Sequence, residues 1–153
     1  MSNSPQTTLS YKDPKALQSW EEIETAIQAI YEKKTHTLSY QELYHHAYLL
    51  TFYGHGETAY LKLKGVLEKL AVKMLSSIGS FDSEEQILTK IVNSWTEYKQ
   101  IIIILKAVFL YLDNNFVHTK NLPPILVLGH EVFANVLLVT KNGVYLRALE
   151  IIL

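Results

Sequence analysis

The chain has 153 residues, enough for one domain that buries a core without disulfides or structural metals. It contains no cysteine, which excludes disulfide frameworks and thiolate zinc sites and fits a reducing compartment. Its 14 basic and 15 acidic residues give a formal net charge of -1, and no Lys/Arg cluster supplies the positive stripe that nucleic-acid binding needs, so nucleic acid is not expected as a partner.

The segment 1–12 opens with the polar run MSNSPQTT, which lacks the basic and apolar regions of a signal peptide, and we expect a disordered lead. The most apolar run, Ile101 to Leu112, contains Lys106 and falls short of the roughly 20 apolar residues that a membrane-spanning helix needs. We expect a buried helix there. The protein should therefore be soluble, cytoplasmic or nuclear, and without a membrane partner.

Asp13-Pro14 predicts the start of the first helix, with Asp13 as its N-cap and Pro14 at the first helical position. The polar stretch from Lys33 to Thr37 indicates where this helix ends. Apolar residues recur between these points at spacings of three and four, which predicts that one face packs on a core. These residues are Leu17, Trp20, Ile23, Ile27 and Ile30.

The stretch 38–60 predicts the second helix and is the most informative part of the chain. Ser39 and Glu42 have the spacing of a capping box, so the helix should begin at Tyr40. Its apolar face is too wide for one neighbouring helix to cover. One arc, assigned to the core, holds Leu43, Ala47 and Leu50, and the arc beside it holds Tyr40, Tyr44 and Tyr48, with Gln41 beyond.

Glycines at positions 54 and 56 indicate the end of the second helix, because glycine tolerates the left-handed cap. A third helix is predicted from Glu57 to about Leu75, followed by a loop from Ser76 to Ser80. Its predicted apolar face carries Tyr60, Leu63, Leu67, Leu70 and Leu75.

A fourth helix of unusual length is predicted to continue to Asp113, capped by Asp82 or Ser83, since Glu85 and Gln86 follow each at the capping-box distance. Four consecutive isoleucines, 101–104, would suit a strand in isolation. The helical period on both sides of them favours a helix. That period runs through Leu88, Val92, Trp95, Tyr98, Ile102, Leu105, Phe109 and Leu112.

Asn114 and Asn115 indicate the end of the long helix, and Pro123-Pro124 imposes an extended connection before a fifth helix over 125–140. Asn142-Gly143 predicts a turn. Residues 144–153 then begin another amphipathic pattern. We therefore predict an all-α bundle of five helices, one of them long, with the start of a further helix at the C-terminus, and we expect the chain to be part of a longer protein.

Six histidines raise the question of a metal site or of acid–base chemistry: His36, His45, His46, His55, His118 and His130. No two of them lie on one predicted helix at the spacing of three or four residues that aims two imidazoles at one ion. Gly54-His55-Gly56 lacks the third glycine and the lysine of a phosphate-binding loop. We expect no metal, no cofactor and no catalytic residue. A small helical enzyme or metal-binding bundle that uses the histidines is the alternative from another class.

Several groups of residues resemble the N-terminal domain of the cullin family. The first groups are Trp20, Ala26-Ile27, Ile30, the run LSYQELY over 38–44, Ala47-Tyr48, Gly56-Glu57 and Tyr60. The later groups are Trp95, Tyr98, Tyr111-Leu112-Asp113, Phe116-Val117, Leu128-Gly129 and Phe133. The match covers about residues 13–153. The motif of the second helix, with His-Gly-Glu after it, is most similar to the branch that uses BTB-domain adaptors, cullin-3.

The resemblance implies a first cullin repeat over 13–143, with 144–153 as the start of the next repeat's first helix. It implies a non-catalytic scaffold of a cullin-RING ubiquitin ligase whose second and fifth helices dock a BTB-domain substrate adaptor. A RING subunit is expected as a partner only if a longer chain exists. Tyrosines at helical spacing more often fill a core, but the resemblance favours a partner-binding role. By position, the docking residues would be Leu38, Tyr40, Gln41, Tyr44, Tyr48 and Phe116.

Three departures from the family pattern bear on the adaptor. Asn114-Asn115 stands where the family usually has an arginine after the aspartate, Ala134-Asn135 stands where it has Arg-Asp, and His45-His46 replaces another basic and polar pair. A Skp-like or elongin-type adaptor therefore stays an alternative, as does a natural short form that acts as a decoy. A contribution from the lead, through Leu9 or Tyr11, also stays open.

Overall fold

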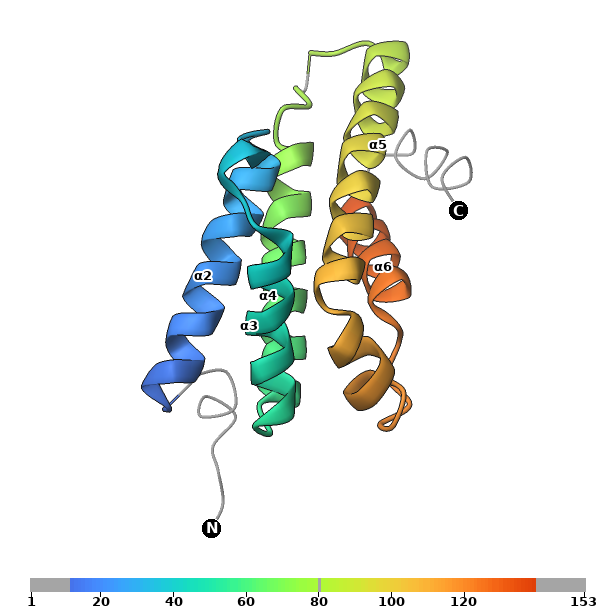
Figure 1. The fold of residues 1–153 in the computed structure, drawn as a ribbon. Coiled ribbons are helices and arrows are strands. Elements are labelled where there is room, and N and C mark those ends of the chain that lie inside the picture. The colour runs from blue at the N-terminus through green and yellow to red at the C-terminus, as the bar shows by residue number, and fades with distance from the viewer. Residues whose placement is uncertain (1–11, 80, 140–153) are drawn as a thin grey trace.

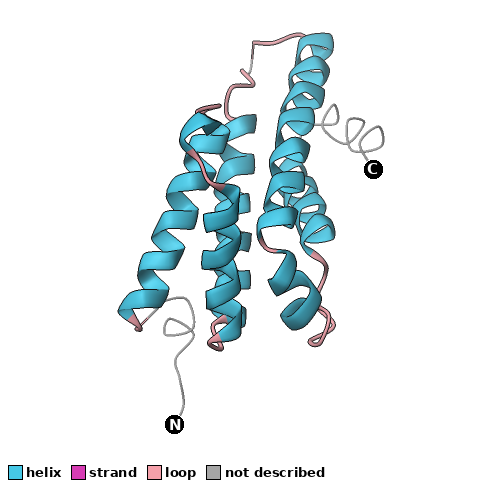
Figure 2. Cartoon of the chain, in the orientation of Figure 1, coloured by secondary structure: helices cyan, strands magenta, loops and turns pink. Residues whose placement is uncertain are grey.

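The computed structural model describes residues 12–79 and 81–139, and these form a helical bundle without strands, as predicted (Figure 2). Outside the described residues lie positions 1–11 of the predicted lead, which include Leu9 and Tyr11, and the helix predicted over 144–153. The described elements are α2 (Pro14–Tyr31), the short helix η1 (Thr35–Thr37), α3 (Tyr40–Phe52), α4 (Gly56–Leu75), α5 (Glu84–Val108), η2 (Leu112–Val117) and α6 (Ile125–Val139).

The helices pack in two neighbouring groups that share α4. Helix α2 packs on α3, and α5 packs on α6, while α4 contacts α3, α5 and α6. Figure 1 shows α2 and α3 side by side, with α5 and α6 on the other side of the bundle. Segment η2 follows α5 and contacts α3 and α4. Residues far apart in the sequence, on α3 and on η2, are therefore brought to one end of the bundle.

Side-chain caps explain where several helices begin. Asp13 Oδ1 accepts a hydrogen bond from the Lys15 N–H at 3.0 Å, and Pro14 takes the first helical position, as predicted. Ser39 Oγ accepts from the Glu42 N–H at 3.3 Å, which is the serine half of the predicted capping box. Ser83 carries the complete box with Gln86, and the predicted choice between Asp82 and Ser83 is thereby decided.

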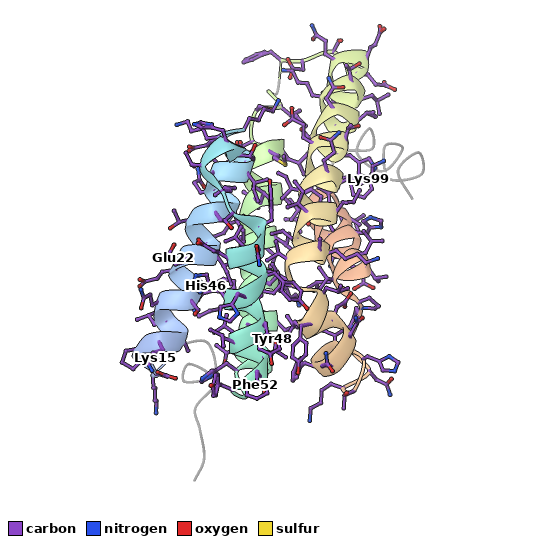
Figure 3. The ribbon with its side chains drawn as sticks, viewed as in Figure 1. Lys15, Glu22, His46, Tyr48, Phe52 and Lys99 are labelled. Atoms are coloured by element: carbon purple, nitrogen blue, oxygen red, sulfur yellow. The ribbon has the colours of Figure 1, made fainter. Side chains whose placement is uncertain are left out.

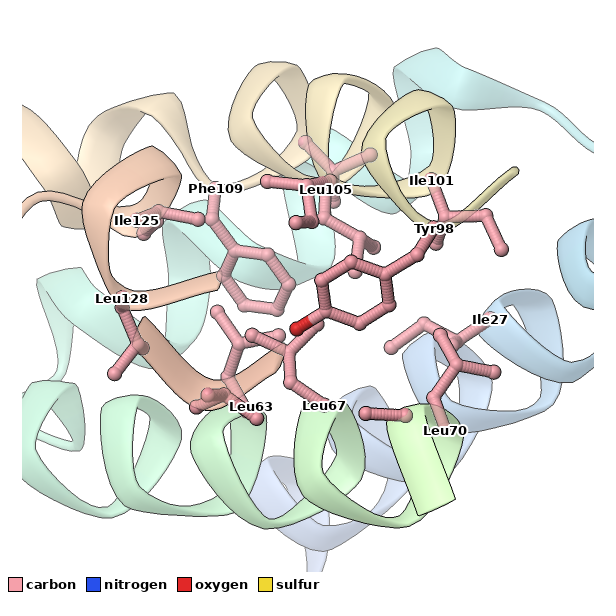
Figure 4. Close-up of a cluster of buried hydrophobic side chains, with 14 of the residues drawn as sticks. Ile27, Leu63, Leu67, Leu70, Tyr98, Ile101, Leu105, Phe109, Ile125 and Leu128 are labelled. Atoms are coloured by element: carbon pink, nitrogen blue, oxygen red, sulfur yellow. The ribbon is translucent and has the colours of Figure 1, made fainter. Parts of the chain in front are cut away.

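A core of apolar side chains runs between the two groups of helices. Figure 4 shows Tyr98 of α5 and Phe109, the residue after α5, facing Leu63 and Leu67 of α4. The Tyr98 hydroxyl donates to the Gly129 carbonyl oxygen at 2.8 Å, so this buried polar group is satisfied. Burial of the phenol raises the pKa of Tyr98 above its usual range, with a smaller contribution from Glu68. The hydroxyl therefore remains a donor within the core.

The predicted core faces are confirmed for α3 and α4 and need correction elsewhere. Leu17 is 41% exposed, and Ala16 takes its place on the buried face of α2. On α5, Leu88 and Val92 are half-buried, whereas the preceding residues Ile87 and Ile91 are buried. Both pairs of residues are apolar and recur at a spacing of four, so the helical period alone did not show which pair faces the core.

The long helix does not continue to Asp113 as predicted. Helix α5 ends at Val108, and the chain continues into the wide turns of η2, where the His118 N–H donates to the Asp113 carbonyl oxygen, five residues back, at 3.1 Å. Asn114 and Asn115, predicted to end the helix, lie inside η2. Asp113 Oδ1 accepts from the Ile125 N–H at 3.1 Å, which joins η2 to the first residue of α6.

Gly54 and Gly56 have different roles at the junction of α3 and α4. Gly54 adopts φ +86°, the left-handed conformation predicted for a helix stop. Gly56 instead begins α4, one residue before the predicted start at Glu57. A Cβ atom at Gly56 would lie 2.7 Å from Phe116 Cδ2, so glycine is what allows η2 to approach α4 here.

Candidate protein-docking surface

Helix α3 has one buried face and one exposed face. Leu43, Ala47 and Leu50 are buried in the core, as predicted. Tyr40 is 44% exposed and Tyr44 is 39% exposed, on the part of the helix that does not face the core. The exposed face of α3 is therefore available to another molecule without loss of internal packing.

Tyr40 borders an apolar groove between α3 and α5. The groove has a volume of about 430 Å³ and is lined by Tyr40, Ile103, Ile104, Ala107 and Val108. Ile103 is exposed, whereas Ile101 and Ile102 are buried. Sequence reasoning missed Ile103, although a run of four isoleucines on a helix must place some of them outside the core, since the core covers only one face.

Tyr48 differs from the other two tyrosines because it is half-buried and held by other rings. Its ring centroid lies 4.6 Å from that of Tyr111 and 5.6 Å from that of Phe52, and Phe52 lies 5.2 Å from Tyr53. Figure 3 shows Tyr48 and Phe52 near each other toward one end of α3. We call Tyr48, Phe52, Tyr53 and Tyr111 the aromatic row. The prediction named only the first of them.

The remaining predicted docking residues have mixed environments. Gln41 is exposed and lines a shallow hollow with Tyr44 and His45. Leu38 is half-buried and packs against the core from the segment between η1 and α3. Phe116, also half-buried, lies on η2 in close contact with Gly56. The fold therefore exposes Tyr40, Gln41 and Tyr44 directly and gives Leu38 and Phe116 a partly structural role.

The histidines have separate environments. His46 Nδ1 lies 3.1 Å from Ser19 Oγ, and His55 Nε2 lies 3.9 Å from Asp13 Oδ2. Over residues 12–79 and 81–139, no three His, Cys, Asp or Glu side chains gather in a group that could hold a metal ion. Within the same ranges, no helix is long and apolar enough to cross a membrane.

His130 lies at the contact between α5 and α6. Its ring packs edge-on against Trp95, with the centroids 4.9 Å apart, and its Nε2 atom is buried with no hydrogen-bond partner. Burial lowers the pKa of His130 below its usual range, and the positive charge of Lys99 lowers it further. A neutral imidazole packed on a tryptophan is a structural feature of the α5–α6 contact.

The chain is similar to a family model and to several known proteins. A family model described as the cullin alpha solenoid domain matches residues 20–153. Cullin-3 of Dictyostelium discoideum is 28% identical over 115 residues, which cover 75% of this chain and 15% of that protein. Cullin-3 of Caenorhabditis elegans is 29% identical over 134 residues, covering 83% of this chain and 16% of that protein.

Cullin-4 of Dictyostelium discoideum is also similar, at 31% identity over 118 residues, which cover 74% of this chain and 14% of that protein. The chain thus spans less than a fifth of the length of each of these three relatives. The matched residues include all of α3, α4, α5, η2 and α6.

Proposed function

Because the chain belongs to the cullin family, we propose that it is a non-catalytic scaffold module of a ubiquitin ligase and that it docks a BTB-domain substrate adaptor. The docking surface consists of the exposed face of α3 together with η2. The observation that carries the proposal is the exposure of Tyr40 and Tyr44 on a helix whose opposite face is already buried.

The chemistry of this surface supports protein docking. Tyrosine suits an interface because its ring buries a large area while its hydroxyl can stay hydrated, and tyrosine is enriched among the residues that dominate binding energy. The apolar groove beside Tyr40 adds exposed aliphatic surface from Ile103 on α5. A partner that covers α3 would bury both at once.

The module would contribute to ubiquitin transfer by holding the substrate receptor in place. A scaffold that holds a substrate receptor at one end makes ubiquitin transfer at its other end effectively intramolecular. No catalytic side chain is needed in the docking module for this mechanism. A RING subunit would bind only to a longer chain, and the cytoplasm or nucleus is the proposed location.

Tyr44→Ala tests the proposal. The substitution should weaken the affinity for a BTB-domain adaptor by about 1–2 kcal/mol, because it removes an exposed ring from the centre of the surface. The melting temperature should change little, since Tyr44 is not part of the core. Isothermal titration calorimetry and thermal unfolding measure the two effects. The matched control is Phe81→Ala, which removes a fully exposed ring from the loop between α4 and α5, at the opposite end of the bundle from the end of α3 (Figure 1).

The adaptor class is tested by presenting the chain with a panel of BTB-domain, Skp-like and elongin-type adaptors in a pull-down. The proposal expects a BTB-domain protein to be retained and Tyr44→Ala to reduce its retention. Retention of only a Skp-like or elongin-type adaptor would contradict the proposed class. Retention of none of them would contradict adaptor docking itself.

A further inference from the structure

The outer end of the aromatic row is exposed although its rings are large. Phe52 is 58% exposed and Tyr53 is 67% exposed, whereas Tyr48 at the inner end is half-buried. The core contacts of α3 are complete without Phe52 and Tyr53, because Leu43, Ala47 and Leu50 already fill its buried face. Contiguous exposed rings of this kind mark interaction sites more often than they serve folding.

A hollow adjoins the exposed end of the row. It has a volume of about 500 Å³ and lies between the start of α2 and the end of α3, where its lining includes Asp13, Ala16, Leu49, Tyr53 and His55. Tyr53 thus forms one wall of the hollow and one end of the row. A concave site next to exposed rings is the arrangement that accepts an anchoring side chain from a partner.

The row is continuous with the proposed docking surface through a shared residue. Tyr48 was assigned to docking by the family resemblance, and its ring contacts Phe52, which in turn contacts Tyr53 edge-on. A molecule that covers Tyr44 and Tyr48 would meet Phe52 on the same side of the helix, since residues four positions apart share a face.

We propose that the adaptor contact extends along the whole of α3 and that Phe52 and Tyr53 bind the same BTB-domain adaptor directly. This inference rests on the proposed function and adds two residues that the resemblance does not assign. Because the side chains of the aromatic row carry no charge, the adaptor segment that covers the row is apolar. Its polar groups meet the tyrosine hydroxyls of the row and the polar lining of the hollow, Asp13, Lys15 and His55. Tyr53 and its neighbouring hollow make this end of the contact a determinant of which adaptor is accepted.

Thiol labelling tests the contact directly, because the natural chain has no cysteine and each variant carries a single reporter. The reporters are Tyr44→Cys, Tyr53→Cys and, as the control, Phe81→Cys. A BTB-domain protein retained in the pull-down is added at saturating concentration, and the rate of maleimide labelling is compared with and without it. We expect the adaptor to slow labelling at positions 44 and 53 by at least about tenfold and to leave position 81 unchanged.

The pattern of protection separates the two proposals. Protection at position 44 without protection at position 53 would overturn the extended contact and leave the proposed function standing. Protection at neither position would overturn the proposed function. In the absence of the adaptor, the labelling rate at position 53 should not depend on the concentration of the chain. A rate that falls as this concentration rises would show that a second copy covers the row, and it would overturn the inference.

Affinity measurements separate direct contact from an effect on Tyr48. Phe52→Ala should weaken adaptor binding by about tenfold and Phe52→Tyr should restore most of the affinity, while Phe81→Ala serves as the matched control. The same Phe52→Ala change is then made in a Tyr48→Ala background. A remaining loss of affinity supports direct contact by Phe52, and a complete disappearance of the loss would show that Phe52 acts only by holding Tyr48, which contradicts the inference.

Discussion

At the scale of single residues, two glycines on helices have opposite environments. A Cβ atom at Gly129 of α6 would lie 2.5 Å from Ile102 Cδ1 in the core, whereas a Cβ at Gly65 of α4 would meet no atom within 4 Å. Gly129 also supplies the carbonyl oxygen that accepts the Tyr98 hydroxyl. The sequence contains both glycines but gives no indication of this difference, because it depends on how closely α5 approaches α6.

Gly129→Ala should therefore destabilise the fold by about 1–3 kcal/mol, because the added methyl group displaces Ile102 in a packed core. Gly65→Ala is the control and should stabilise the fold by about 0.5–1 kcal/mol, because alanine loses less backbone entropy in a helix and has space there. Urea unfolding followed by circular dichroism measures both. A stable Gly129→Ala variant would mean that the α5–α6 contact can relax.

Some environments of individual residues on α3 could be predicted from the sequence, and others could not. The core residues of α3 followed from helical spacing alone, and the structure buries all three. The width of the apolar face separated the arc of Tyr40 and Tyr44 from the core arc, but only the family resemblance favoured a partner-binding role for these tyrosines. The half-burial of Tyr48 could not be predicted, because its ring partner Tyr111 lies 63 positions away in the chain, directly before η2.

At the scale of elements, the starts of helices were predictable and the end of α5 was not. Caps at Asp13, Ser39 and Ser83 are local patterns of a few residues, and each accepts the expected backbone hydrogen bond. The wide turns of η2 depend on hydrogen bonds five residues apart and on the contact between Phe116 and Gly56. Nothing in the local composition of residues 109–117 distinguishes such turns from a continuing α-helix.

The two serine caps lead to a prediction about their relative strength. Ser83→Ala should cost about 1–2 kcal/mol of stability, because it removes the acceptor of the 3.2 Å bond from the Gln86 N–H and disrupts a capping box whose other bond runs from the Ser83 N–H to Gln86 Oε1 at 2.8 Å. Ser39→Ala should cost less, about 0.5–1 kcal/mol, because only the serine half of the box is formed, at 3.3 Å. Chemical denaturation of the two variants gives the comparison. Equal losses would indicate that the bond from the Ser83 N–H to the Gln86 side chain does not strengthen the serine cap.

At the scale of the whole molecule, the resemblance to the cullin family is confirmed by the family model over residues 20–153 and by relatives named Cullin-3. The all-α architecture is confirmed as well. The boundaries of the first repeat at residue 143 and of the next helix at 144 remain predictions, as they fall outside the described residues. The identities of the docking residues also remain predictions, because they depend on contacts with a partner.

The stability of the whole fold should depend on pH through His130. Its pKa is lowered in the folded state, so the unfolded chain binds the proton more tightly, and the stabilisation present above the ordinary histidine pKa is lost as the pH falls below it. The urea midpoint should therefore be lower at pH 5 than at pH 7.5. His130→Gln should reduce this difference.

His36→Gln provides the control for the pH measurement, because His36 is exposed on η1. It should leave the difference between the two pH values as it is in the unaltered chain. An unchanged pH dependence in His130→Gln would show that other groups, and not the imidazole packed on Trp95, account for the loss of stability in acid.

The hydrogen bond from Ile125 to Asp113 has a consequence for orientation. One carboxylate belongs to the segment that carries Phe116 and also caps the first residue of α6, so these two parts cannot swivel independently while the bond is intact. The first turn of α6 is thus tied to η2, and with it to one part of the proposed docking surface. If the proposed docking is right, this bond fixes the orientation of a partner bound at η2 relative to the start of α6.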